Sequence, residues 1–410
     1  MTHSYDHDQT CTSHRNSSGA RTHRGRPRHR AALGAGLALA VLLAACGGDD
    51  SAEPSDPTGA GTSPDSEPSA ELAVVAGEPF PAERCAANAA AGTITYHTGF
   101  DYAATASIIE VLVAEVAGYY DELCLDVTVT PGFSVANYPL VAANDVQFAS
   151  AGSFSEVATF SEANQADLVA LSVDGHVPID ALIVKPGVAA QLADLAGATF
   201  GIKGDLPPSV RAMLATAELA DGEDYHTVLL DGFDPAAHLA VPDIVGMPGW
   251  KSNEPGALER AGIEFELFDP SDFGVPGSFG LIYTNREFLD AHPTAAEDFM
   301  RATLRGLNEA IADPAAAARA TFELAESNGN PNFLSLDGET FRWATDAALI
   351  VDTTPAGSFP GVPIADELSI EIAAYNAVGV YPDGAPSIEG RWSDLVASLY
   401  DADGTVIWPD

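Results

Sequence analysis

Basic residues are scarce in this chain of 410 residues. It carries 18 Lys and Arg against 59 Asp and Glu, which gives a formal net charge of −41. The lysines are Lys185, Lys203 and Lys251. Such a charge repels phosphate backbones and anionic membrane surfaces, so it argues against nucleic acid or an anionic bilayer surface as a partner. It says nothing about the fold.

Cysteines and catalytic motifs are also few. The four cysteines are Cys11, Cys46, Cys85 and Cys124. The histidines show no metal-ligand spacing, and the chain has no HExxH, GxSxG or glycine-rich phosphate motif. We therefore expect neither a metal nor a cofactor.

The apolar run from Ala31 to Ala45 is too short to cross a bilayer, because a membrane helix needs about 20 residues. Five arginines between Arg21 and Arg30 precede it, and small residues end it, which is the pattern of a secretory signal. Leu43-Ala44-Ala45-Cys46 resembles the lipobox of bacterial lipoproteins. The resemblance implies a signal peptide over 1–45 and a lipid on Cys46 that holds the protein at the outer face of the cell membrane. An ordinary cleaved signal is the alternative.

Residues 46–82 consist mainly of Gly, Ser, Pro, Asp, Glu and Thr, which cannot bury enough apolar surface to fold, so they predict a disordered tether. Export would place Cys85 and Cys124 in an oxidising compartment, and we predict a disulfide between them. A loop of this length contributes about 4 kcal/mol in the chain-entropy model. Two buried free thiols are the alternative.

Strands alternate with helices from residue 92 onward. Thr93–Tyr96 reads as a strand, and apolar residues from Ile108 to Val116 recur at helical spacing, with Ser107 and Glu110 as a capping box. This alternation predicts an α/β fold with mostly parallel sheets covered by helices. We expect three segments after the tether: 83–184 as the first part of lobe 1, 185–277 as lobe 2, and 278–410 as the return to lobe 1 with C-terminal helices.

Three stretches carry a family resemblance: Ala114–Tyr120 followed by Leu125-Asp126-Val127, Asp145–Gly152, and Leu195–Ile202, where Ala198 replaces the usual lysine. In this order they resemble substrate-binding proteins of bacterial ABC importers. The branch is that of the nitrate, sulfonate, taurine and thiamine-pyrimidine receptors. The likeness covers about residues 92–330.

The resemblance implies a two-lobed periplasmic-binding-protein fold of type II, with crossing strands near 179–184 and 279–284. It implies a monomer that binds a small solute between its lobes and delivers it to permease and ATPase subunits. We also expect that the protein is not an enzyme, because catalysis on this scaffold needs a cleft nucleophile or a clustered Cys/His set, and the only cysteines of the folded part are expected to be bridged. An enzyme on the same scaffold and a lipid-anchored sensor remain alternatives.

Candidate ligand contacts lie in loops after strands, where open α/β sheets bind their ligands. Asp101-Tyr102 stands where thiamine-pyrimidine receptors carry Asp-Trp. Trp250, Asn253 and Glu254 are similar to the family's aromatic–Asn–Glu segment. The other candidates are Gly152, Ser153, Asp174, Lys203 and Ser209. Each also has a purely structural interpretation, as a turn residue, helix cap or ion-pair partner.

The ligand class stays open between two chemistries. Acidic acceptors and two aromatic residues favour a flat nitrogen heterocycle of thiamine-pyrimidine type. A sulfonate or nitrate-type anion would instead need Lys203 and several N–H groups.

Overall fold

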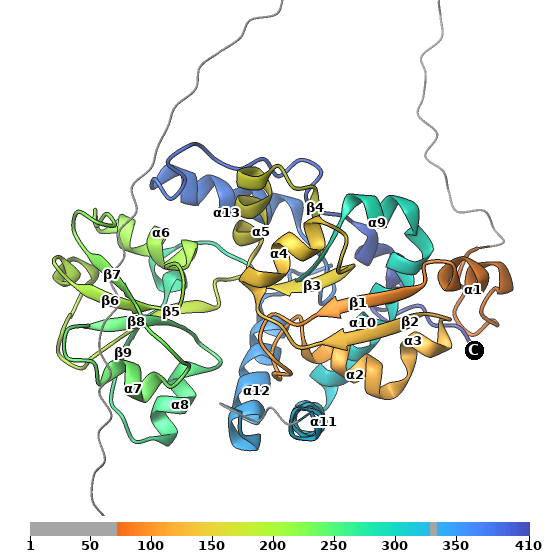
Figure 1. The fold of residues 1–410 in the computed structure, drawn as a ribbon, viewed down its shortest axis with the longest axis horizontal. Helices are drawn as coiled ribbons and strands as arrows, with labels where there is room; N and C mark the ends of the chain where they lie inside the picture. Colours follow the sequence, from red (N-terminus) through yellow and green to blue (C-terminus); the bar gives the residue numbers. More distant parts are fainter. Residues whose placement is uncertain (1–71, 329–333) are drawn as a thin grey trace, which may run out of the picture. The chain divides into compact units, whose positions relative to one another are not determined.

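Two mixed sheets of five strands each organise residues 72–328 and 334–410, the part of the chain that this computed structural model describes (Figure 1). Helices flank both sheets. The predicted signal peptide, Cys46 and residues 46–71 of the predicted tether lie outside the described residues. The α/β fold with two lobes that the sequence predicts is confirmed.

The first sheet has the strand order β2-β1-β3-β10-β4. Strands β1, β2 and β3 pair in parallel, whereas β10 runs antiparallel to both β3 and β4. Strands β4 and β10 are buried along their whole length, as expected of strands covered on both faces. The strands are β1 (Thr93–His97), β2 (Asp126–Thr130), β3 (Phe148–Ala151), β4 (Leu168–Gly175) and β10 (Phe279–Asn285).

The second sheet repeats this plan in the order β7-β6-β8-β5-β9. Strand β6 is parallel to β7 and β8, and β5 runs antiparallel to β8 and β9. The strands are β5 (Asp180–Val184), β6 (Thr199–Ile202), β7 (His226–Leu229), β8 (Gly246–Trp250) and β9 (Glu266–Phe268).

The chain passes between the two sheets twice, from β4 to β5 and from β9 back to β10. Residues 83–184 were expected in the first lobe, but β5 pairs within the second sheet. By sheet membership the first crossing therefore lies between Gly175 and Asp180, one strand earlier than expected. The strand expected at 279–284 is β10, and it lies in the first sheet.

Most helices lie next to the sheet whose strands they connect. Around the first sheet lie α1 (Ala82–Ala89), α2 (Ile109–Ala117), α3 (Tyr119–Glu122), α4 (Ser134–Ala142), α5 (Phe154–Asn164), α9 (Arg286–Ala291), α10 (Pro293–Ala312) and α11 (Pro314–Ser327). Around the second lie α6 (Pro208–Thr216), α7 (Pro235–Leu239) and α8 (Glu254–Arg260). The chain continues through α12 (Leu336–Thr353) and α13 (Ala365–Ala377), and 3₁₀ turns occupy Leu192–Leu195, Pro270–Phe273 and Leu395–Leu399.

A disulfide fixes α1 to the first lobe. Cys85 of α1 is bonded to Cys124, which follows α3, so the predicted pairing is present in the structure. The last residues of the expected tether, before residue 82, make contacts with the rest of the chain. Gly77 N–H donates to the Trp408 carbonyl, and the Glu78 carbonyl accepts from Asp410 N–H. Residues just before α1 therefore lie along the C-terminal segment.

The capping box predicted from Ser107 and Glu110 is wrong. Ser107 has φ +63°, and its hydroxyl donates to the Ala106 carbonyl at 2.6 Å, while Ile108 occupies the N-cap of α2. Glu110 is buried beside Asp174, and burial together with this neighbouring carboxyl raises the pKa of Glu110 well above its usual range. The carboxyl of Glu110 is therefore buried, whereas the pattern predicted an exposed capping carboxylate.

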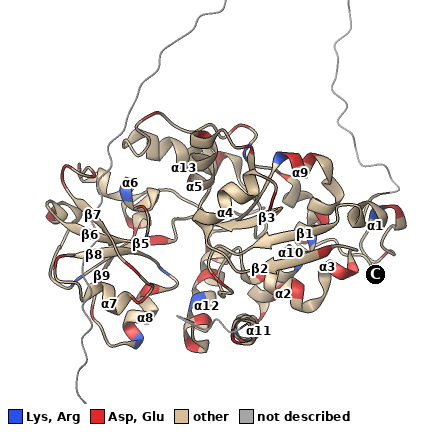
Figure 2. Ribbon diagram, in the orientation of Figure 1, with Lys and Arg blue, Asp and Glu red and all other residues tan. Residues whose placement is uncertain are grey.

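Acidic residues are distributed over both lobes, with few basic residues among them (Figure 2). Among residues 72–328 and 334–410, no helix combines the length and apolar character needed to span a membrane.

Candidate functional site

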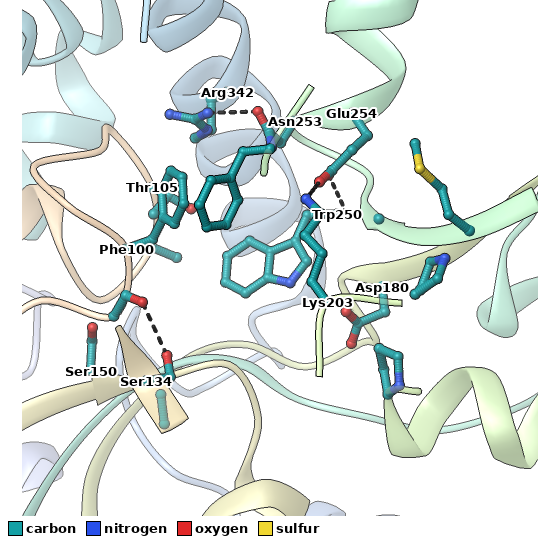
Figure 3. A pocket seen from close by; sticks show the side chains of 18 of the residues that line it. Phe100, Thr105, Ser134, Ser150, Asp180, Lys203, Trp250, Asn253, Glu254 and Arg342 are labelled. Atoms are coloured by element: carbon teal, nitrogen blue, oxygen red, sulfur yellow. Dashed lines mark hydrogen bonds and ion pairs between the residues drawn. The ribbon is translucent and has the colours of Figure 1, made fainter. Parts of the chain in front are cut away.

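A cavity of about 260 Å³ lies between the two sheets (Figure 3). It is lined by residues at the carboxyl ends of strands: Gly99 and Phe100 beyond β1, Ser150 and Ala151 in β3, and Lys203 beyond β6. Parallel strands of one sheet end at a common edge, which is where open α/β sheets bind ligands. The cavity thus occupies the position expected of a binding site in this fold.

Asp180 lines the cavity because its strand, β5, runs antiparallel to its neighbours β8 and β9. It is the first residue of β5 and pairs in register with Trp250, the last residue of the antiparallel strand β8. The beginning of β5 therefore lies at the same edge as the ends of its neighbours, and both residues line the cavity.

Aromatic rings from both lobes meet at the cavity. Phe100 of the first lobe and Phe233 of the second lie 5.2 Å apart between ring centroids, at an interplanar angle of 68°. Phe133 stacks on Phe233 at 5.8 Å. The half-buried Trp250 adds a larger ring to the wall (Figure 3). Flat rings of this kind offer faces on which an aromatic ligand can stack.

Both cationic side chains in the cavity wall have carboxylate partners. Lys203 Nζ lies 3.1 Å from Glu254 Oε1 and 5.1 Å from the centroid of the Phe233 ring. Arg342 pairs with Glu339, which is fully buried. The positive charge at this site is therefore largely balanced by the protein itself.

Hydroxyl groups line the opposite wall, in the first lobe. Ser134 and Ser150 both face Gly99, where an added Cβ would lie 2.7 Å from each hydroxyl oxygen. A side chain at position 99 would displace these two groups, so glycine is required for the close approach.

Buried carboxylates hold the wall segment 104–108 from behind. Glu339 accepts from Ala104 N–H at 2.6 Å. Asp346 accepts from the Thr105 hydroxyl and from the N–H of residue 106, at 2.6 Å and 3.0 Å. Asp174 accepts from Ser107 N–H at 2.8 Å. Because these N–H groups are already bonded inward, the segment offers the cavity mainly its side chains.

Asp180 is the acidic side chain most altered by this environment. Burial and, after it, the charge of the nearby Glu156 raise the pKa of its carboxyl to about 8. The Ser209 hydroxyl, 3.4 Å from Asp180 Oδ2, acts in the opposite direction. Near neutral pH Asp180 is therefore mostly protonated and presents a hydrogen-bond donor as well as an acceptor.

Replacing Asp180 with Asn is expected to reduce the pH dependence of stability. The folded-state pKa of about 8 lies far above the unfolded value of about 3.9. The folded protein therefore holds a proton that the unfolded chain releases, and stability falls as pH rises between these two values. Asn stays neutral, so the variant should gain stability relative to the wild type as pH rises.

Urea unfolding at about pH 5 and about pH 8 measures this difference. Asp205→Asn is the control, since Asp205 lines the same cavity but is exposed, and its profile should follow the wild type. Parallel profiles for the wild type and Asp180→Asn would contradict the prediction.

Four of the candidate residues line the cavity. Lys203, Trp250, Asn253 and Glu254 come together there from the ends of β6 and β8. The carboxylate of Glu254 connects two of the others: its Oε2 accepts from Trp250 N–H at 2.8 Å, and its Oε1 forms an ion pair with Lys203. Ser209 lies behind this group and reaches the cavity only through Asp180.

Two candidates in the loop after β1 turn away from the cavity. Asp101 is buried at φ +47°, and its carboxylate accepts from Tyr102 N–H at 2.8 Å. Tyr102 packs with Ile108 and Leu112, and its hydroxyl donates to the Val129 carbonyl at 3.3 Å. The ring that faces the cavity from this loop is Phe100.

The remaining three candidates also lie outside the cavity lining. Ser153 caps α5 by accepting from Glu156 N–H at 3.4 Å, and the carbonyl of Gly152 accepts from Gly280 N–H. Asp174 lies behind the wall, bonded to Ser107 N–H. Their roles in this structure are a helix cap, a strand contact and support of the wall.

Further lining residues that were not among the candidates contribute rings, hydroxyls or charge, among them Phe100, Ser134, Ser150, Asp180, Phe233 and Arg342. Phe233 follows β7, so the strand-end rule applied to that loop would have identified it. Arg342 lies in the middle of α12, where no local pattern marks it.

The two sheets, the double crossing and the cavity at the strand ends define the two-lobed periplasmic-binding-protein fold. The chain belongs to the NMT1/THI5-like family, whose model matches residues 105–317. The resemblance to substrate-binding proteins of ABC importers is thereby confirmed at the level of family and fold.

A relative and two solved structures illustrate the likeness. The riboflavin-binding protein RibY of Chloroflexus aurantiacus is 32% identical over 127 residues, which cover 30% of this chain and 36% of RibY, about a third of its length. The periplasmic aliphatic sulphonate-binding protein SsuA from Escherichia coli has a TM-score of 0.53 at 14% identity, covering 74% of this chain and 92% of SsuA. The desulfurization enzyme DSZB has a TM-score of 0.50 at 13% identity, covering 75% and 98%. At these identities the two structures show the fold alone.

Proposed function

We propose that this protein is the solute-binding component of an ABC-type importer. The observation that carries the proposal is the cavity between the lobes, lined by Phe100 from one lobe and by Phe233 and Trp250 from the other. A cleft whose walls belong to two lobes can enclose a small solute and release it when the lobes part.

The solute class we propose is a flat nitrogen heterocycle, of the thiamine-pyrimidine type. Trp250 and Phe100 provide stacking faces, and Glu254 together with the neutral Asp180 can bond to ring N–H groups and ring nitrogens. A cavity of about 260 Å³ lies just below the usual range of about 300–1,000 Å³, which favours a compact ring system. The similarity to RibY, named for another nitrogen heterocycle, supports the same class.

A sulfonate or nitrate-type anion is the second candidate, and Lys203 is the observation that favours it. Against it, Glu254 lies 3.1 Å from Lys203 Nζ, and Arg342 is paired with Glu339. An anion would have to compete with these carboxylates for both cations, whereas a neutral ring would not.

A binding role rather than catalysis fits the chemistry of the cavity. Cys85 and Cys124 are joined in a disulfide, so neither supplies the thiolate that nucleophilic catalysis by cysteine needs. The carboxylates behind the wall are committed to backbone N–H groups. We therefore propose that the protein leaves its solute chemically unchanged.

The proposed setting is the outer face of the cell membrane, with a lipid on Cys46 and a permease and ATPase as partners. Each receptor would act as a monomer. The lipobox-like Leu43–Cys46 supports the anchor. Labelling of cells with a fatty-acid analogue tests it: the mature protein should be labelled, and Cys46→Ala should abolish the label. Equal labelling of both would refute the anchor.

Native mass spectrometry of the protein purified without denaturation tests the ligand class. We expect a retained mass that corresponds to a small nitrogen heterocycle and that is released on unfolding. A retained sulfonate would overturn the heterocycle in favour of the second candidate. Failure of a broad panel of nutrients to raise the thermal stability of ligand-free protein would count against a solute receptor altogether.

A further inference from the structure

Helix α12 brings a charged side chain to the cavity from outside the segment that the family model matches. That segment ends at residue 317, whereas Arg342 lies on α12, lines the cavity and is only 5% exposed. The charge and hydrogen bonds of Arg342 at the cavity therefore come from the part of the chain that follows the matched segment.

Arg342 is bound to the first lobe through a buried acid. Its Nη1 pairs with Glu339 Oε1, one turn earlier on α12, and the other carboxylate oxygen of Glu339 accepts from Ala104 N–H at 2.6 Å. Ala104 belongs to the wall segment of the first lobe. Glu339 is fully buried, and a buried carboxylate that loses its cationic partner is strongly destabilising. The ion pair with Arg342 is therefore expected to persist when the second lobe moves.

The same guanidinium reaches the second lobe. Arg342 Nη2 donates to Asn253 Oδ1 at 2.6 Å, and Asn253 is the residue immediately before α8 (Figure 3). Beside this bond, α8 packs on α12 so tightly that a Cβ added at Gly256 would lie 2.4 Å from the Phe341 ring. The contact joins the two lobes at the cavity.

The crossings between the lobes lie at the far end of α12. Thr353, in the last turn, accepts from His176 N–H in the first crossing, at 3.1 Å. Arg342 precedes Thr353 by 11 residues, which is about 16 Å along a helix. A rotation of about 10° at the crossings would then move Asn253 by about 3 Å, enough to break its bond to Arg342.

We propose that Arg342 and Asn253 form a clasp that holds the lobes together over the cavity. The proposal rests on the proposed function, in which the lobes part to exchange solute. Opening breaks the bond to Asn253 but leaves Arg342 paired with Glu339, so the clasp can reform on each closure. The free energy of the Arg342–Asn253 bond favours the closed state of the two lobes. A solute that binds the closed state more tightly than the open state therefore binds with higher affinity when this bond can form.

Distances between spin labels test the clasp in the absence of ligand. Labels are attached to unnatural amino acids at Asp145 in the first lobe and Asp243 in the second, both exposed, which leaves the cysteines untouched. Asn253→Ala removes the acceptor and should increase the population at long distance. Asn253→Asp replaces the amide with a carboxylate that pairs with Arg342, and it should shift the population towards short distance.

These opposite shifts distinguish a clasp from a direct ligand contact, which would leave the ligand-free distances unchanged. With a hydroxymethyl aminopyrimidine as probe, Asn253→Ala should also weaken binding about tenfold, mainly through faster dissociation. Identical distance distributions in the wild type and both variants would overturn the clasp. If the wild type does not bind the probe, the proposed ligand class fails, while the distances still decide the clasp.

Discussion

Replacing Asp298 with Ala is expected to lower the free energy of unfolding by about 3–5 kcal/mol, because it leaves buried positive charge without its main partner. Asp298 is fully buried in α10. It accepts from Arg84 Nε at 2.6 Å, from Asn88 Nδ2 at 2.7 Å and from Arg301 Nε at 2.9 Å. Urea unfolding at neutral pH and constant ionic strength measures the loss.

Glu297→Gln is the matched control, because Glu297, at the preceding position of the helix, contacts the same two arginines. Its side chain is 28% exposed, however, so water already screens these ion pairs. We expect a loss of about 1 kcal/mol or less. Equal losses in the two variants would show that burial of Asp298 does not determine the effect.

This cluster explains how α1 is held against the first lobe. Arg84 and Asn88 both lie on α1, and the disulfide of Cys85 ties the same helix to the segment after α3. The loop that the disulfide closes contributes about 4 kcal/mol in the chain-entropy model. The disulfide was predictable from two cysteines and their compartment, but Asp298, which accepts from Arg84 and Asn88, lies more than 200 residues away and left no local signal.

The fold was predictable because its cause is local and repeated. Strands with apolar residues and helices with one apolar face alternate along the chain, and that pattern leaves few architectures available. The assignment of β5 was harder. A strand that follows a crossing runs antiparallel to its neighbours in either sheet, and nothing within Asp180–Val184 indicates which sheet it joins.

The site was predictable to the level of loops but not always of side chains. The strand-end rule identified the loop after β1, yet the turn at Asp101, with φ +47°, directs Phe100 rather than Tyr102 to the cavity. A one-residue difference of this kind depends on backbone geometry that composition does not reveal. Arg342 could not be predicted for a different reason: it is brought to the cavity by the packing of α12 on α8, which is a tertiary contact.

Truncating Trp250 to Ala is expected to weaken solute binding by about 2–4 kcal/mol, the usual cost of removing a central aromatic anchor. This corresponds to an increase of roughly 30- to 1,000-fold in Kd. Trp250 ends β8, and its ring lies in the cavity wall beside Lys203 (Figure 3). Its N–H bond to Glu254 comes from the backbone and should survive the substitution, so the loss would report on the ring itself.

Isothermal titration of the wild type and variants with the compound identified by mass spectrometry measures this effect. Trp250→Phe keeps a stacking face and should recover affinity to within about tenfold of the wild type. Trp408→Ala is the second control, because Trp408 stacks on Arg305, whose guanidinium carbon lies 4.4 Å from the ring centroid, and it does not line the cavity. Its Kd should equal that of the wild type. If Trp250→Ala binds as tightly as Trp408→Ala, the ligand does not stack on this ring, and the heterocycle loses its main structural support.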